Sequence, residues 1–274
     1  MKRALIGVCN NVTRNLPKIK VWADSFKAVC LNDDVLLLTV DASETEVDML
    51  INELDISVFN FQYGGPLSIN DIRLKIMEMC LGSIDYDFLI ATDVFDVIFQ
   101  ANPFTKLEMN KYDIFVSGEG IYVREEPWNA DVIGKCFPDK LAKCLNKEVI
   151  CSGVIAGNRK ALCNLYKMMY ETTIGSLPNH EIRDQAALIV LIADEKIPNL
   201  KILNLNDTWA VHCAVAGPTN FFIDWGFREM LKNNNYSAPY LLGDTILINN
   251  VKVDIVHQFN RIQQWYDTLT KKYE

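Results

Sequence analysis

Two aspartates follow an apolar run in the stretch FLIATDVFDVIFQANPF, residues 88–104. Asp93 comes directly after FLIAT, and Asp96 stands three positions later. One interpretation is structural, because acids after strands often cap a turn or simply remain hydrated. The alternative is a divalent-cation site, because Mg²⁺ and Mn²⁺ prefer oxygen ligands and are often held by carboxylates together with substrate phosphates. The spacing alone leaves both interpretations open.

The segments before these acids predict how the carboxylates would be presented. Short apolar runs alternate with helical patterns, and one of these opens with Ser43 and Glu46 in the spacing of a capping box. Buried strands separated by helices indicate a mainly parallel sheet covered on both faces. Ligands bind outside the carboxyl ends of such strands, where Asp93 is expected. The expected strands are 4–9, 34–40, 56–62 and 87–93, the expected helices are 19–30, 43–54 and 69–83, and a polar turn is expected at 10–17.

The second half of the chain is less regular. No internal repeat, low-complexity tract or linker interrupts it, so we expect one α/β domain over residues 1–274. The expected elements are strands at 114–120 and 149–157, helices at 159–174 and 182–196, and a hairpin with a final strand at 241–259.

Composition and charge exclude some classes of function. Of the 274 residues, 50% are hydrophobic and 23% are charged, which is ordinary for a folded globular domain. The net charge of −8 gives no global field that would attract nucleic acid or anionic lipid. Neither a secretory signal nor an apolar run long enough for a transmembrane segment is present. The eight cysteines show no CxxC pair, so we expect buried, reduced thiols in a cytoplasmic protein rather than a zinc site.

Four segments together resemble the GT-A glycosyltransferases. ATDVFDVIFQANPF resembles the acidic metal-binding region of that family, and CSGVIAGNRKAL (151–162) resembles the segment beside the donor sugar. RDQAAL (183–188) and VHQFNR (256–261) are similar to two further segments, and all four occur in the family's order over roughly residues 1–262. The resemblance implies a GT-A (Rossmann-like) fold, with residues 1–110 as the nucleotide-binding half and 111–274 as the donor-sugar and acceptor half.

The resemblance also implies a metal site formed by Asp93, Asp96 and His257. A histidine after a strand is otherwise more often a hydrogen-bonded structural residue. As a ligand, its imidazole nitrogen would favour Mn²⁺ over Mg²⁺. This prediction requires His257 to emerge at the sheet edge next to Asp93, with the strand of residues 253–256 ending beside 88–92. The sequence departs from a strict DxD pattern, because Ala91 stands two positions before Asp93.

The remaining candidates follow the same resemblance. Arg73 would lie near the diphosphate or the donor sugar, unless it is only a solvated helix residue. Asp184 would contact sugar hydroxyls or act as a base, unless it only caps a helix, and Glu119 is a second candidate base. Trp128 and Trp209 would stack on a sugar or pack in the core. The residues expected to bind the nucleotide-sugar are Cys9, Asn10, Asn11, Asp41, Arg73, Thr92, Ser152, Gly153 and Gln185.

These features favour a metal-dependent transferase that takes a nucleotide-sugar, most simply a UDP-sugar, and a glycan or other hydroxyl acceptor. A nucleotidyltransferase is the nearest enzymatic alternative, although VCNNVTRN (8–15) lacks the glycine-rich phosphate loop expected there. A glycan-binding protein on a decayed GT-A fold is the non-catalytic alternative. The lack of an anchor suits a bacterial enzyme, or one of a large DNA virus that acts in the host cytoplasm.

Overall fold

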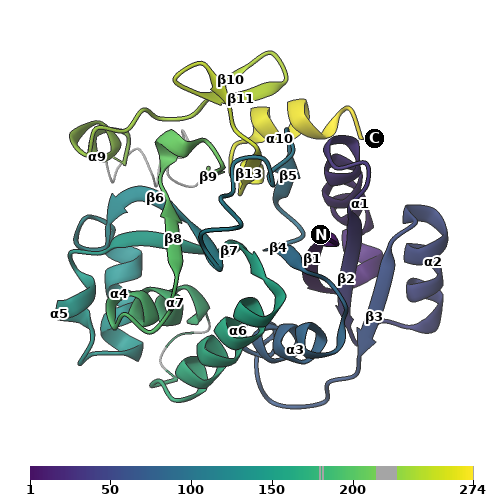
Figure 1. Ribbon diagram of the computed structural model, residues 1–274, viewed down its shortest axis with the longest axis horizontal. Helices are drawn as coiled ribbons and strands as arrows, with labels where there is room; N and C mark the ends of the chain where they lie inside the picture. The colour runs from purple at the N-terminus through teal and green to yellow at the C-terminus, as the bar shows by residue number, and fades with distance from the viewer. Residues whose placement is uncertain (179, 181, 214–226, 274) are drawn as a thin grey trace.

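A seven-stranded sheet forms the centre of the computed structural model, which describes residues 1–178, 180, 182–213 and 227–273. The strand order is β3-β2-β1-β4-β7-β6-β8 (Figure 1). β7 runs antiparallel to its neighbours β4 and β6, whereas the other neighbouring pairs are parallel, so the predicted mainly parallel sheet is confirmed. The strands are β1 (Arg3–Asn10), β2 (Asp34–Val40), β3 (Ser57–Phe61), β4 (Phe88–Thr92), β6 (Ile114–Tyr122), β7 (Glu148–Asn158) and β8 (Leu200–Leu203).

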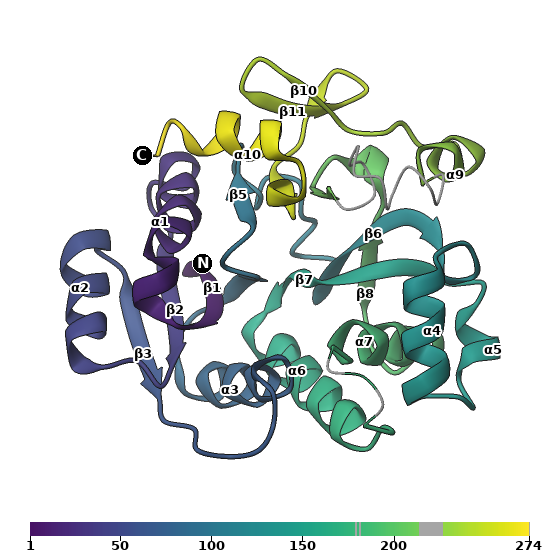
Figure 2. The same ribbon diagram turned by 180° about the vertical axis from the view of Figure 1, so that it is seen from behind.

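Helices cover both faces of this sheet (Figures 1 and 2). The buried apolar side chains form two hydrophobic clusters. One cluster joins the sheet to α1 (Val12–Val29) and α2 (Glu44–Leu54). The other joins it to α3 (Ile69–Ser83), α4 (Pro127–Cys136), α6 (Arg159–Ile174) and α7 (Asp184–Ala193), and the short α5 (Leu141–Cys144) lies beside α4 and α7. Within the described residues, no helix is both long and apolar enough to cross a membrane.

β4 shows why its sequence is continuously apolar. Phe88 and Ile90 pack in the cluster with α1, whereas Leu89 and Ala91 pack in the cluster with α3. Side chains of a strand alternate between its two faces, so a strand buried on both faces needs apolar residues at every position. By the same alternation, Asp93 lies on the same face as Leu89 and Ala91, so it is turned toward α3 where β4 ends.

A second, three-stranded sheet has the order β5-β13-β9. Its strands are β5 (Val97–Phe99), β9 (Ala210–His212) and β13 (Ile255–His257). The final strand therefore pairs with β5 and β9, and it ends at His257. The meander β10 (Tyr240–Leu242), β11 (Thr245–Ile248) and β12 (Val251–Lys252) confirms the predicted hairpin, and α9 (Phe227–Asn233) and α10 (Gln263–Thr270) complete the C-terminal part.

The polar turn expected at 10–17 was wrong, because α1 already begins at Val12. Asn11 precedes it with a φ of 50°, a left-handed conformation that asparagine tolerates. Val12 is buried in the core, which favours the helical turn although Pro17 removes one backbone hydrogen bond. Burial of Val12 in the core therefore outweighs the preference of Asn11 and Pro17 for a turn.

The capping box at the start of α2 gives a first prediction. Ser43 Oγ accepts the Glu46 N–H at 3.3 Å, and Glu46 Oε2 accepts the Ser43 N–H at 2.9 Å. Ser43→Ala should lower the free energy of unfolding by about 1 kcal/mol, because one N–H of the first turn loses its acceptor. Urea denaturation measures this, with Ser57→Ala on exposed β3 as the control. Equal losses in the two variants would contradict the role of the cap.

Candidate functional site

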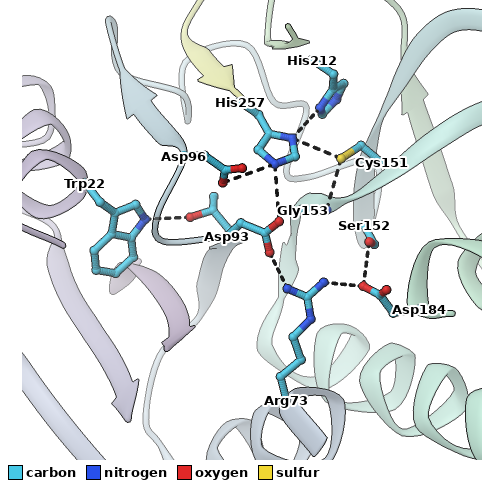
Figure 3. A network of polar contacts seen from close by, with 11 residues as sticks. Trp22, Arg73, Asp93, Asp96, Cys151, Ser152, Gly153, Asp184, His212 and His257 are labelled. Carbon is cyan, nitrogen blue, oxygen red and sulfur yellow. Dashed lines mark hydrogen bonds and ion pairs between the residues drawn. The ribbon is translucent and has the colours of Figure 1, made fainter. Parts of the chain in front are cut away.

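Arg73 of α3 joins two carboxylates at the carboxyl end of β4. Its Nη1 donates to Asp93 Oδ1 at 2.5 Å, and its Nη2 donates to Asp184 Oδ2 at the start of α7 (Figure 3). Ser152 Oγ of β7 also donates to Asp184 Oδ2, at 2.8 Å. Asp184 is buried, and its Oδ1 has no hydrogen-bond partner in the described part of the chain. The guanidinium thereby links the end of β4 to the start of α7, and Ser152 joins β7 to the same carboxylate.

Asp93, Asp96 and His257 converge beside this arginine. His257 Nε2 lies 3.4 Å from Asp93 Oδ2 and 3.6 Å from Asp96 Oδ1 (Figure 3). The imidazole is buried, whereas the side chains of Asp93 and Asp96 are 28% and 20% exposed. The three groups therefore form a half-open site with its carboxylate side toward solvent, and the predicted proximity of residues 93 and 257 is confirmed.

Main-chain contacts bring these groups together. The Asp93 N–H donates to Gly153 O at 2.9 Å, which ties β4 to β7. The Gln258 N–H donates to Asp96 O at 2.7 Å, directly after His257 leaves β13. Gln258 has a φ of 59°, a left-handed conformation that is uncommon for glutamine. Such backbone strain persists where surrounding contacts impose it, as the small sheet does here.

Gly153 leaves room for the three groups. A Cβ at this position would lie 2.7 Å from Asp93 Oδ2 and 2.7 Å from His257 Cε1. Any side chain would therefore displace both of them. The expected importance of Gly153 thus has a steric cause, which the sequence did not reveal.

The protonation states are set by opposing effects. Burial disfavours ionisation of Asp93, but the Arg73 guanidinium outweighs it and holds the Asp93 pKa well below its ordinary value. Burial raises the pKa of Asp96. For His257, burial alone would lower the pKa, but Cys151, Asp96 and Asp93 together raise it well above the ordinary value. The carboxylate oxygens of Asp93 and Asp96 lie at the open side of the cluster, where they can serve as oxygen donors to a cation.

A divalent cation fits this donor set. An octahedral ion with ligands at about 2.1 Å places adjacent ligand atoms about 3 Å apart, so the carboxylate oxygens, now 3.4 and 3.6 Å from His257 Nε2, would move about 0.5 Å closer to it on binding. The ligand atoms of Asp93, Asp96 and His257 all lie within 4.8 Å of one another. His257 Nε2 is buried without a well-aligned hydrogen bond in the described structure, so its lone pair is open to a metal when the ring is neutral. Two oxygens and one nitrogen suit Mn²⁺ better than Mg²⁺.

Two hollows lie at this edge of the sheet, and the smaller is lined in part by Asp93. The larger has a volume of about 380 Å³ at the carboxyl ends of β1 and β2, and Asn10, Asn11 and Asp41 line it together with Tyr63. This volume is within the range of small-molecule sites. The smaller, of about 20 Å³, is lined by Thr92 and Asp93 together with the side chains that hold Arg73. The hollows are neighbours along α3, since Ile72 lines the first and Arg73 the second.

Several predicted residues are held by core packing or by hydrogen bonds to other parts of the chain. Cys9 lies in the core on the α1 side, and burial raises its pKa to about 12, so its side chain packs rather than binds. Trp209 is also buried, with Nε1 donating to Pro103 O at 2.9 Å, so stacking on a sugar is excluded for this side chain. Trp128 is partly buried against the His180 ring. Thr92 lines the smaller hollow while its Oγ1 accepts the indole N–H of Trp22 at 2.8 Å.

Gln185 is oriented by two residues that sequence reasoning missed. Asn129 Nδ2 donates to Glu126 Oε2 at 2.7 Å, so Asn129 Oδ1 faces the other way and accepts Gln185 Nε2 at 3.0 Å. Glu126 also accepts the main-chain N–H groups of Trp128 and Asn129, so this carboxyl group serves as the acceptor that decides the orientation of both amides. Gln185 consequently turns its Oε1 away from Asn129, as an acceptor for another group.

His212 and Cys151 were also missed as neighbours of the cluster. His212 Nδ1 lies 2.9 Å from His257 Nδ1, and Cys151 Sγ lies 3.3 Å from the same atom. A signal existed, because WAVHC and DIVHQ both place a histidine after a short apolar run. Only the register of β9 and β13 shows that the two histidines are paired.

Glu119 on β6 has an unusual protonation state. Burial and the neighbouring Glu126 carboxylate raise its pKa to about 8. The carboxyl group is therefore protonated at neutral pH, and it would act as a base only above that value. This property makes it suited to donating a hydrogen bond.

Comparisons with known proteins show the fold. No family model matches the chain, and no curated protein matches it by sequence. Among solved structures, the galactosyltransferase LgtC in complex with donor and acceptor sugar analogues is similar, with a TM-score of 0.57 and 16% identity over 93% of this chain and 86% of that one. An active-site mutant of LgtC gives a TM-score of 0.57 at 15% identity over the same shares. The chain therefore has a GT-A fold like that of LgtC.

Gly153→Ala tests the steric argument. The new methyl group should displace Asp93 and His257, so we expect Mn²⁺ affinity, measured by calorimetry, to fall by at least about 10-fold. Gly82→Ala is the matched control, because nothing lies within 4 Å of a Cβ at that helical position. The control should keep Mn²⁺ binding and gain up to about 1 kcal/mol of stability. Unchanged Mn²⁺ affinity in Gly153→Ala would contradict the proposed crowding.

Glu119→Gln should remove a pH-dependent loss of stability. Unfolded glutamate ionises near its ordinary pKa, whereas folded Glu119 stays protonated up to about 8. The folded state binds more protons between these values, so wild-type stability falls as the pH rises through this window. The melting temperature of Glu119→Gln should therefore rise relative to that of the wild type as the pH increases from about 5 to about 8. The exposed control Glu53→Gln should give a profile of melting temperature against pH that is parallel to the wild-type profile. A parallel profile for Glu119→Gln would contradict the prediction.

Proposed function

We propose that this protein is a divalent-cation-dependent glycosyltransferase that moves a sugar from a UDP-sugar to a glycan or other hydroxyl acceptor. The observation that carries the proposal is the convergence of Asp93, Asp96 and His257 beside Arg73, at the carboxyl edge of the sheet. The likeness to LgtC, solved with donor and acceptor sugar analogues, supports it.

The two hollows suggest how a donor would lie. The nucleoside would occupy the hollow lined by Asn10, Asn11 and Asp41, so residues 1–110 would supply most of the nucleotide contacts. The diphosphate would then reach Arg73 and the cluster of Asp93, Asp96 and His257. The sugar would lie toward Ser152, Asp184 and Gln185, which belong to the second half of the chain, residues 111–274.

Each residue has a defined task in this arrangement. Asp93, Asp96 and His257 would hold Mn²⁺, which when bound supplies positive charge against the departing diphosphate. Arg73 would add a fixed positive charge, held in place by Asp93 and Asp184. Asp184 is buried and paired, so contact with sugar hydroxyls suits it better than proton abstraction. Glu119 would donate a hydrogen bond at neutral pH.

The reaction breaks the bond between the anomeric carbon and the diphosphate oxygen, and that oxygen leaves with the nucleoside diphosphate. A new bond forms between the anomeric carbon and the acceptor hydroxyl oxygen, whose proton is taken up by the departing diphosphate or by solvent. Because the chemistry is a substitution at carbon, the chain's main tasks are to position both substrates and to offset the leaving charge.

A panel of UDP- and GDP-sugars tests this function through release of nucleoside diphosphate. Turnover should stop with EDTA and return with Mn²⁺ more fully than with Ca²⁺. Asp93→Asn should lower turnover by at least about 100-fold, because the amide supplies no charge to the cation. The exposed Asp85→Asn is the matched control and should behave like the wild type.

Two results would contradict the proposal. Full turnover in excess EDTA would show that Asp93, Asp96 and His257 hold no required cation. Binding of glycans without any donor turnover, and without a need for UDP or Mn²⁺, would show a glycan-binding protein instead.

A further inference from the structure

The two ring nitrogens of His257 face different surroundings. Nε2 points to the carboxylates of Asp93 and Asp96, on the side open to solvent. Nδ1 points to the interior, where His212 Nδ1 lies at 2.9 Å and Cys151 Sγ at 3.3 Å (Figure 3). His212 and His257 are each 1% exposed, so water cannot replace either contact.

The distance between the two Nδ1 atoms requires one shared proton. Two nitrogens approach to 2.9 Å only when one donates and the other accepts. If Nε2 of His257 offers its lone pair to a cation, the ring proton must be on Nδ1. Nδ1–H then points at His212 Nδ1, which must be the acceptor. Metal-bound histidines commonly donate their second ring N–H to such a partner, which fixes tautomer and ring orientation.

The interior contacts fit a hydrogen-bonded support better than a second metal site. Cys151, His212 and His257 could in principle hold a soft cation. However, the 2.9 Å between the two Nδ1 atoms is an ordinary hydrogen-bond distance, whereas two nitrogen ligands of a tetrahedral zinc ion would lie about 3.3 Å apart. Cys151 Sγ also accepts the Gly153 N–H at 3.3 Å, which occupies part of its capacity.

The fold presets His212 for this contact. β9 and β13 are parallel, and their register places His212 directly beside His257. The Cys213 N–H donates to His257 O at 2.9 Å, which locks the two backbones together at these residues. The rings meet edge to face at 85° with centroids 5.1 Å apart, so each ring limits the rotation of the other.

We propose that His212 is a positioning residue that accepts the Nδ1–H of His257 and thereby keeps Nε2 available to the cation. The inference rests on the proposed function, because it assumes a cation at Asp93, Asp96 and His257. His212 itself does not reach the cation, and it acts only through the His257 ring.

Two variants at position 212 test the role. His212→Phe keeps a buried ring but removes the acceptor, whereas His212→Asn keeps an acceptor oxygen near the position of Nδ1. Calorimetry with Mn²⁺, alone and with UDP, should show affinity reduced about 10- to 100-fold in His212→Phe and within about threefold of wild type in His212→Asn. Melting temperatures report whether each variant is folded.

Nitrogen-15 spectra of the wild type give a readout independent of these variants. With diamagnetic Mg²⁺ and UDP bound, the proton should reside on Nδ1 of His257 and on Nε2 of His212. A proton on Nδ1 of His212 in that state would overturn the inference, as would wild-type Mn²⁺ affinity in a folded His212→Phe. If the wild type binds neither cation with UDP, the proposed function fails as well. Normal Mn²⁺ binding in both variants would contradict only the positioning role of His212, and the proposed function would not be affected.

Discussion

The contact of Arg73 with Asp93 and Asp184 is the interaction on which the arrangement of the site depends. Buried and half-buried charges are stable only when they are paired, and this guanidinium pairs the carboxylates at the end of β4 and the start of α7. Because Arg73 belongs to α3, the pair also sets how that helix lies against the sheet edge. Ser152 then adds β7 to the same network. The position of the site therefore depends on how α3, α7, β4 and β7 pack together.

A second constraint comes from the small sheet. His257 follows Asp96 by more than 150 residues, and β13 reaches it only because β5 starts directly after Asp96. The antiparallel register pairs His257 with Val97, which places the imidazole next to the aspartate by backbone geometry alone. β9 on the other side contributes His212 by the same means. The proposed cation site and its proposed support by His212 thus both depend on this small sheet.

Hydrophobic periodicity and the resemblance to the GT-A family predicted different parts of this structure. Apolar runs identified the strands of the first half, and the ordered motifs predicted that Asp93 and His257 lie close together. The start of α1 was missed, because Asn and Pro usually signal turns and only the burial of Val12 reveals the helix. The roles of Gly153 and His212 depend on contacts between residues far apart in the chain. No local pattern encodes such contacts, so the sequence could name Gly153 without explaining it and did not point to His212.

The departure from a strict DxD pattern has a structural explanation. Residues 89, 91 and 93 lie on one face of β4, so a first acid would stand at position 91, about 6.6 Å deeper than Asp93. Ala91 is registered between Ile6 of β1 and Ile155 of β7, and all three are buried. A carboxylate there would lose its hydration without gaining a partner. Asp96 avoids this cost, because it stands after the strand, where the β4–β5 turn exposes it and the β5–β13 pairing brings His257 to it. The second acid of this protein is thus supplied by the turn instead of the strand, and this position requires the small sheet.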